Sequence, residues 1–143
     1  EVMQRVKSLS MAAVEDPSWE RIRTRLEFLM HDKSKVTDDL VATRRTIYAQ
    51  PGMVEGMRRA LVLQEMEIRQ RNLLKPEDWA CIRAPTLVLW TEHDPTAPPS
   101  QGRYIADLIP GAQFRVMEGC GHWPQYEDAE TFNRIHLDFL LGK

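Results

Sequence analysis

An alternation of strand and helix patterns in the second half of the chain constrains its fold more than any other feature. Residues 84–90 are a short apolar run bounded by proline and polar residues, which is typical of a strand buried on both faces, and the run at residues 113–117 predicts a second strand. A polar loop and an amphipathic helical pattern follow each run, and we expect helices at residues 100–109 and 128–141. This order predicts an α/β fold in which two parallel strands are flanked by helices.

The expected sheet is too small to be stable alone. No third run of comparable quality is present in the sequence. Two parallel strands with apolar faces do not form a stable sheet by themselves, and their outer edges need partners. We therefore expect the remaining strands to come from further sequence, from another chain or from a dimer.

The first half of the chain carries helical patterns instead of strand patterns. Apolar residues there recur at the spacing of one helix face. The segment before Asp16 predicts only irregular structure or a weak helix. The sequence thus predicts a helical part at residues 1–74 and an α/β part at residues 75–143. The three helical patterns lie at residues 19–30, 37–50 and 54–71.

Composition and charge argue against several classes of function. The chain of 143 residues is 43% hydrophobic and 28% charged, which is typical of a folded domain. Its net charge of -2 and the lack of a basic cluster argue against nucleic acid as a partner. No apolar run approaches the roughly 20 residues that span a bilayer, and no signal peptide is visible, so we expect a cytoplasmic protein that does not enter a membrane. Cys81 and Cys120 are expected to be reduced thiols.

Asp94 and His122 are the candidate catalytic residues. Asp94 lies a few residues after the first expected strand, and His122 lies a few residues after the second. The carboxyl ends of parallel strands meet at one edge of a sheet, where open α/β sheets bind ligands. A carboxylate there can orient an imidazole, which can then take a proton from a hydroxyl nucleophile and pass it to the leaving group. The sequence therefore predicts an acid–histidine pair at this edge.

The other histidines and cysteines are weaker candidates. His93 is expected to be a loop residue, and His31 and His136 are expected to be surface or satisfied groups on helices. Cys120 lies two residues before the candidate histidine, but in a glycine turn, so we do not expect it to be a nucleophile. No pair of histidines and carboxylates has the spacing of a zinc site, so no metal is predicted.

These motifs resemble the C-terminal half of α/β-hydrolases. Residues 84–90 and 92–95 look like the strand and acid turn of that family, and residues 119–124 look like its histidine turn. The order of acid and then histidine near the C-terminus also fits. The resemblance implies that residues 75–143 form the end of the hydrolase core and that residues 1–74 form the helical lid that precedes it.

A narrower resemblance is to the meta-cleavage-product hydrolases, which cut a C–C bond in vinylogous 1,5-diketones formed by aromatic ring cleavage. Residues 121–127 and 132–134 are similar to their histidine turn and its following helix, and residues 40–44 resemble the lid segment whose arginine holds the dienoate carboxylate of the substrate. The match implies Arg44 as the carboxylate ligand and Trp123 as a wall of the same pocket. It implies no cofactor and no metal, and it makes assembly into a homo-oligomer an expectation.

The nucleophile of the family is absent from this sequence. In α/β-hydrolases it is a serine on a G-x-S-x-G elbow between a strand and a helix, and no such motif occurs here. The glycine-rich oxyanion-hole segment is absent as well. We therefore expect an N-terminal hydrolase half or a partner chain to supply the nucleophile and the missing strands, and we expect the chain alone to be inactive.

Two other functions stay open at this point. One is an esterase, epoxide hydrolase or dehalogenase of the same fold, against which the Arg44 segment and residues 123–125 argue. The other is a non-catalytic half-domain that binds a partner or assembles through its sheet edge, which the missing nucleophile favours for the chain as it stands.

Overall fold

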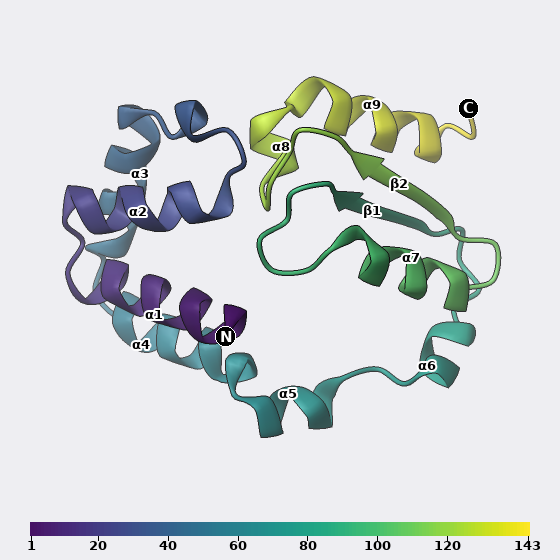
Figure 1. Ribbon diagram of the computed structural model, residues 1–143, viewed down its shortest axis with the longest axis horizontal. Coiled ribbons are helices and arrows are strands. Elements are labelled where there is room, and N and C mark those ends of the chain that lie inside the picture. The colour runs from purple at the N-terminus through teal and green to yellow at the C-terminus, as the bar shows by residue number, and fades with distance from the viewer. The chain divides into compact units, whose positions relative to one another are not determined.

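The computed structural model describes residues 1–143, which divide into two compact units. The first unit comprises residues 1–28 and 33–73, and the second comprises residues 29–32 and 74–143. Four residues from within the helical half of the sequence therefore belong to the second unit. Figure 1 shows the helices of the first unit in purple to teal and the strands and helices of the second unit mainly in teal to yellow.

The first unit is entirely helical. Helix α1 packs against α4 and the 3₁₀ helix η2, and α3 contacts α4. Thr37 caps α3 by accepting a hydrogen bond from the amide of Leu40 at 3.2 Å, and two aspartates occupy the first turn of α3, where they suit the helix dipole. The elements are α1 (Val2–Glu15), α2 (Trp19–Leu29), η1 (Lys33–Lys35), α3 (Asp38–Tyr48), α4 (Met53–Ala60), η2 (Leu61–Gln64) and α5 (Met66–Asn72). Its buried apolar side chains are Ala13, Val14, Ile22, Leu26, Val36, Val41, Tyr48 and Leu61.

One prediction for this unit is wrong, and one open alternative is decided. Irregular structure or a weak helix was expected before Asp16, and the structure shows a helix of 14 residues that packs against α4 and whose Ala13 and Val14 are buried. The single helix expected at residues 54–71 is divided into α4, η2 and α5. Glu65 has extended backbone angles of -74° and 122°, which end the helical path before α5 begins.

The second unit contains a parallel two-stranded sheet, as predicted. Strands β1 (Leu87–Thr91) and β2 (Gln113–Met117) pair so that Leu87 lies opposite Gln113 and Thr91 lies opposite Met117. Helix α7 packs on both strands, and Figure 1 shows α9 on the other side of the sheet. The carboxyl ends of both strands therefore lie at one edge. The helices are α6 (Pro76–Ala80), α7 (Pro99–Leu108), α8 (Pro124–Glu127) and α9 (Ala129–Leu140).

The strands are less buried than the expectation of apolar strand faces predicts. The first four residues of β1 are half-buried, and Arg115 and Val116 of β2 are exposed. Only Thr91 and Met117, at the carboxyl ends, are buried, because each strand of this small sheet has one neighbour and an open outer edge. The prediction of burial on both faces is therefore wrong for the chain as it stands.

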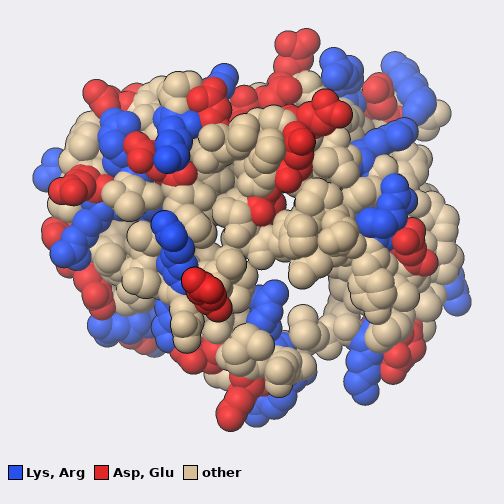
Figure 2. Space-filling view, viewed as in Figure 1, with Lys and Arg blue, Asp and Glu red and all other residues tan.

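Charge is mixed over the surface that Figure 2 shows. Lysine and arginine side chains are interspersed with aspartate and glutamate side chains on this face, without a large region of one sign. None of the helices has both the length and the apolar character needed to cross a membrane.

Candidate active site

Two loops leave the carboxyl ends of β1 and β2, and backbone hydrogen bonds fasten them to each other. The amide of Glu92 donates to the carbonyl of Met117 at 2.9 Å. The amide of His93 donates to the carbonyl of Cys120 at 3.0 Å. These bonds extend the contact between the strands into the loops. The residues that follow His93 in one loop and Cys120 in the other are thereby brought close together.

Asp94 and His122 meet at this edge of the sheet. Nδ1 of His122 lies 2.9 Å from Oδ2 of Asp94. The Asp94 side chain is 15% exposed, whereas that of His122 is 42% exposed. A neutral imidazole that donates from Nδ1 to a carboxylate carries its lone pair on Nε2. The arrangement can therefore take a proton at Nε2 while the carboxylate stabilises the charge that forms on the ring.

Thr96 holds the second oxygen of the Asp94 carboxylate. Oδ1 accepts hydrogen bonds from the Thr96 amide at 2.7 Å and from the Thr96 hydroxyl at 2.6 Å. Burial alone would raise the pKa of the Asp94 carboxyl, because it disfavours the charged form. The hydrogen bonds from His122 and Thr96 outweigh burial and lower this pKa from 3.8 to about 2. Asp94 is thus an ionised carboxylate at neutral pH, and both its oxygens are bound.

The histidine turn is also bound to residues 29–32 of the second unit. The amide of His122 donates to the carbonyl of Leu29 at 2.7 Å. The ring of His31 stacks on that of His93, with ring centroids 3.7 Å apart and an angle of 11° between the planes. His31 follows the end of α2 rather than lying on a helix as predicted. The acid loop and the histidine turn therefore share a third neighbour from far away in the sequence.

Arg44 and Trp123 lie in different units. Arg44 is half-buried in α3 of the first unit, and Trp123 is half-buried at the N-terminus of α8 in the second unit. Their expected roles in substrate binding stay predictions.

A second arginine accompanies Arg44 in the first unit. Burial lowers the pKa of Arg25 on α2, an electrostatic interaction with Tyr48 opposes this shift, and the charge of Arg44 adds to it. Nε of Arg25 donates to the Ser10 hydroxyl at 3.1 Å, and its guanidinium lies 5.8 Å from the centre of the Tyr48 ring. Helices α2 and α3 thus bring the guanidinium groups of Arg25 and Arg44 close enough for the charge of Arg44 to influence Arg25.

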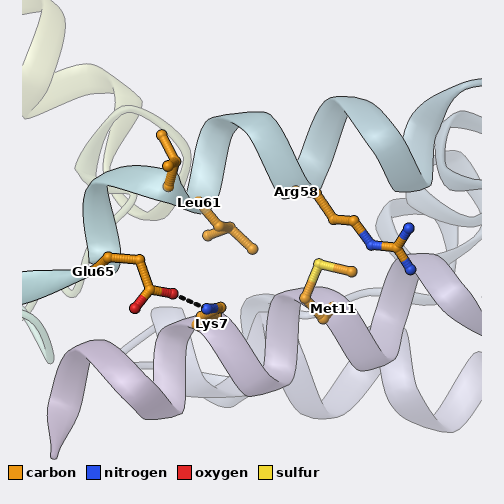
Figure 3. Close-up of a pocket in the computed structure, with 6 residues that line it drawn as sticks. Lys7, Met11, Arg58, Leu61 and Glu65 are labelled. Carbon is orange, nitrogen blue, oxygen red and sulfur yellow. Dashed lines mark hydrogen bonds and ion pairs between the residues drawn. The ribbon is translucent and has the colours of Figure 1, made fainter. Parts of the chain in front are cut away.

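A separate groove in the first unit contains none of the candidate residues. It has a volume of about 330 Å³ and lies along α1, α4 and η2. Figure 3 shows Lys7 and Glu65 paired across one end of the groove, and Met11, Leu61 and Arg58 along its wall. No three histidine, cysteine, aspartate or glutamate side chains come together in the structure in a way that could hold a metal ion.

Sequence reasoning found the acid–histidine pair but missed two groups that hold it. The Asp94-x-Thr96 spacing is a usable signal, because a carboxylate often accepts hydrogen bonds from the residue two positions later. The contribution of residues 29–32 has no local signal, since their hydrogen-bond partners His122 and Glu127 lie 93 to 96 residues further along the chain.

Comparison with known proteins supports the expected fold. The sequence matches the family described as the alpha/beta hydrolase family over residues 4–135. It is 32% identical over 126 residues to a 2-hydroxy-6-oxononadienedioate/2-hydroxy-6-oxononatrienedioate hydrolase of Cupriavidus pinatubonensis, covering 87% of this chain and 42% of that protein. It is 34% identical over 128 residues to the hydrolase of the same name from Comamonas testosteroni, covering 89% of this chain and 43% of that protein.

A solved structure shows the same similarity. The meta-cleavage product hydrolase CumD from Pseudomonas fluorescens matches with a TM-score of 0.77 and 31% identity, covering 89% of this chain and 47% of that chain. The chain therefore spans less than half the length of these relatives. The predicted fold class is confirmed, and the chain belongs to the alpha/beta hydrolase family.

Proposed function

We propose that this chain supplies the acid and the histidine of a serine hydrolase that cleaves a C–C bond in a 2-hydroxy-6-oxodienoate. The observation that carries the proposal is the 2.9 Å contact between Nδ1 of His122 and Oδ2 of Asp94 at the carboxyl ends of two parallel strands. The names of the most similar relatives support the choice of substrate class.

In this proposal His122 moves protons and Asp94 orients it. Asp94 keeps the proton on Nδ1, so Nε2 can accept the hydroxyl proton of a serine nucleophile. The reaction also requires a proton on a substrate carbon before the C–C bond breaks, and the imidazolium of His122 is the group that can deliver it. Asp94 remains ionised throughout, since its pKa of about 2 lies far below neutral pH.

The serine itself is proposed to come from outside this sequence. None of the serines in the chain lies in a G-x-S-x-G segment. The open edges of the two-stranded sheet need further strands, which an N-terminal hydrolase half or a partner chain would bring together with the nucleophile. We expect the chain alone to be inactive, because both the nucleophile and the oxyanion hole are needed for acyl transfer.

Arg44 and Trp123 are proposed to bind the substrate. A planar guanidinium pairs with a carboxylate through two parallel hydrogen bonds, which suits the carboxylate end of a dienoate. An indole next to the catalytic histidine offers a flat apolar wall for the conjugated chain.

The test is a chimera in which the unmatched N-terminal part of the Comamonas testosteroni relative is fused to this chain. We expect the chimera to consume a 2-hydroxy-6-oxodienoate, and Asp94→Asn to lower kcat by roughly 10⁴-fold. Arg44→Lys should raise KM for the dienoate, whereas Arg45→Lys, at the exposed neighbouring position, should not. A folded chimera that hydrolyses aryl esters and leaves the dienoate intact would favour an esterase. Full dienoate turnover in Asp94→Asn would refute the proposal.

A further inference from the structure

Glu127 is a buried carboxylate whose hydrogen-bond partners are backbone amides from two distant segments. The residue ends α8 and is 7% exposed. Its Oε1 accepts from the amide of Gly121 at 2.7 Å. Its Oε2 accepts from the amides of His31 at 2.9 Å and Asp32 at 3.2 Å. One oxygen therefore binds the histidine turn, and the other binds residues 29–32.

The chemistry of these contacts requires an acceptor at both oxygens. A buried carboxylate loses its hydration, and hydrogen bonds are one of the interactions that can offset that cost. Charge-assisted bonds from N–H groups are stronger than bonds between neutral groups, so three of them suit an ionised side chain. A glutamine at position 127 would have one oxygen acceptor, and its NH₂ group would face an N–H donor. The amides of the two bound segments therefore favour a carboxylate over an amide side chain at position 127.

The two segments that Glu127 joins also contact each other directly. The amide of His122 donates to the carbonyl of Leu29 at 2.7 Å. A Cβ atom on Gly121 would lie 2.5 Å from that carbonyl oxygen, 2.6 Å from the amide nitrogen of His31 and 3.0 Å from Oε1 of Glu127. Two successive amides of the histidine turn are thus fixed by acceptors, and a glycine is the residue that allows this approach.

The same segment reaches the acid loop. His31, whose amide is bound by Glu127, stacks its ring on that of His93. His93 directly precedes Asp94 and is bound through its amide to the carbonyl of Cys120. Glu127 therefore fixes a segment that touches both loops of the acid–histidine pair.

We infer that Glu127 is a positioning residue that directs the imidazole of His122 toward the carboxylate of Asp94. This role rests on the proposed function, because the pair transfers protons only while Nδ1 stays on the carboxylate and Nε2 faces the nucleophile. Glu127 acts through the backbone of the histidine turn and touches no reacting atom.

The first test reads the ring of His122 without any enzyme activity. Glu127→Gln is compared with Glu130→Gln, a matched change at an exposed position in the first turn of α9. In the ¹⁵N-labelled chimera described above, the ring nitrogen resonances report which nitrogen of His122 carries the proton, and amide exchange in β1 and β2 reports the fold. We expect Glu127→Gln to abolish the preference for a proton on Nδ1 while the strand amides keep their protection. Glu130→Gln should change neither.

The second test uses the chimera described above. A displacement of about 1 Å in a catalytic group costs up to roughly 100-fold in rate, so Glu127→Gln should lower kcat by roughly 10- to 100-fold with KM unchanged. A purely structural role would lower the melting temperature but leave kcat per folded molecule intact. Glu130→Gln should retain the parent kcat.

Each outcome separates this inference from the proposed function. A folded Glu127→Gln variant that keeps the Nδ1 proton and the parent kcat overturns the inference. Loss of the Nδ1 preference in a chain whose parent chimera leaves the dienoate intact refutes the proposed function but supports the positioning role. If Glu127→Gln does not fold, Glu127→Asp keeps the charge on a shorter side chain. If that variant also fails to fold, or folds with the parent ring state, Glu127 is only structural and the inference is wrong.

Discussion

Replacement of Gly121 by alanine should destabilise the second unit, because the added methyl group has no space. Its Cβ would lie 2.5 Å from the carbonyl oxygen of Leu29 and 2.6 Å from the amide nitrogen of His31. Both are backbone atoms, which cannot rotate away as a side chain can. The segment at residues 29–32 must therefore separate from the histidine turn.

The magnitude follows from what this separation breaks. Overpacking a closely packed site costs about 1–3 kcal/mol. Weakening the hydrogen bond from Gly121 to the Glu127 carboxylate, or that from His122 to Leu29, costs about 1 kcal/mol more. The expected loss of stability is therefore about 2–4 kcal/mol, which corresponds to a change of roughly 30- to 1,000-fold in the opening equilibrium.

Native-state hydrogen exchange in the chimera measures this loss within one unit. Amides in β1 and β2 that exchange through unfolding of the second unit should exchange faster by the factor given above. Gly56→Ala is the matched control, since Gly56 lies in α4 and a Cβ there would meet nothing within 4 Å. That change should stabilise α4 by about 0.5–1 kcal/mol, because alanine is the better helix former. Unchanged exchange in Gly121→Ala would refute the steric reasoning.

Three further predictions concern the acid loop and the sheet. Because the pKa of Asp94 is about 2 in the folded protein and 3.8 ordinarily, its stabilisation is complete above about pH 4 and is lost as the pH falls through about 2. This should amount to about 1–2 kcal/mol after allowance for solvent screening, and acid unfolding of Asp94→Asn should lack this pH dependence. Thr96→Val removes the hydroxyl that donates to Asp94 at 2.6 Å, so it should raise the pKa of the Asp94 carboxyl. A ¹³C titration measures this pKa, and an unchanged value would show that the Thr96 hydroxyl does not lower it. Gly102→Ala would place a Cβ 2.5 Å from the Trp90 ring, so we expect a destabilisation of about 1–3 kcal/mol and altered indole fluorescence, and a silent substitution would show that the ring moves without cost.

The strands and their loops were predictable because their signals are local. Apolar runs with a helical pattern between them predict parallel pairing, and β2 occupies the expected residues 113–117. Helix α1 was not predictable from propensity, because its stability comes from packing against α4. The division of the third helical pattern at Glu65 was missed because no glycine or proline marks it.

The candidate site likewise has one part that could be predicted from the sequence and another that could not. Asp94 and His122 were identified because each follows a strand of one parallel pair, so their approach required no knowledge of distant contacts. Glu127 was not identified, since a glutamate before a helix usually faces solvent and its partners His31 and Asp32 are 96 and 95 residues away. Contacts between segments this far apart in the sequence can be recognised only in the folded structure.

Residues 29–32 have a practical consequence for protein engineering. A designer who exchanged the helical half between related hydrolases as one cassette would replace these four residues together with the helices around them. The recipient would then lose the His31 ring that stacks on His93, and a foreign tetrapeptide would have to place its backbone carbonyl and amides correctly against His122 and Glu127. A swap in two pieces, one on each side of this tetrapeptide, should retain the host's own contacts while still changing the helices.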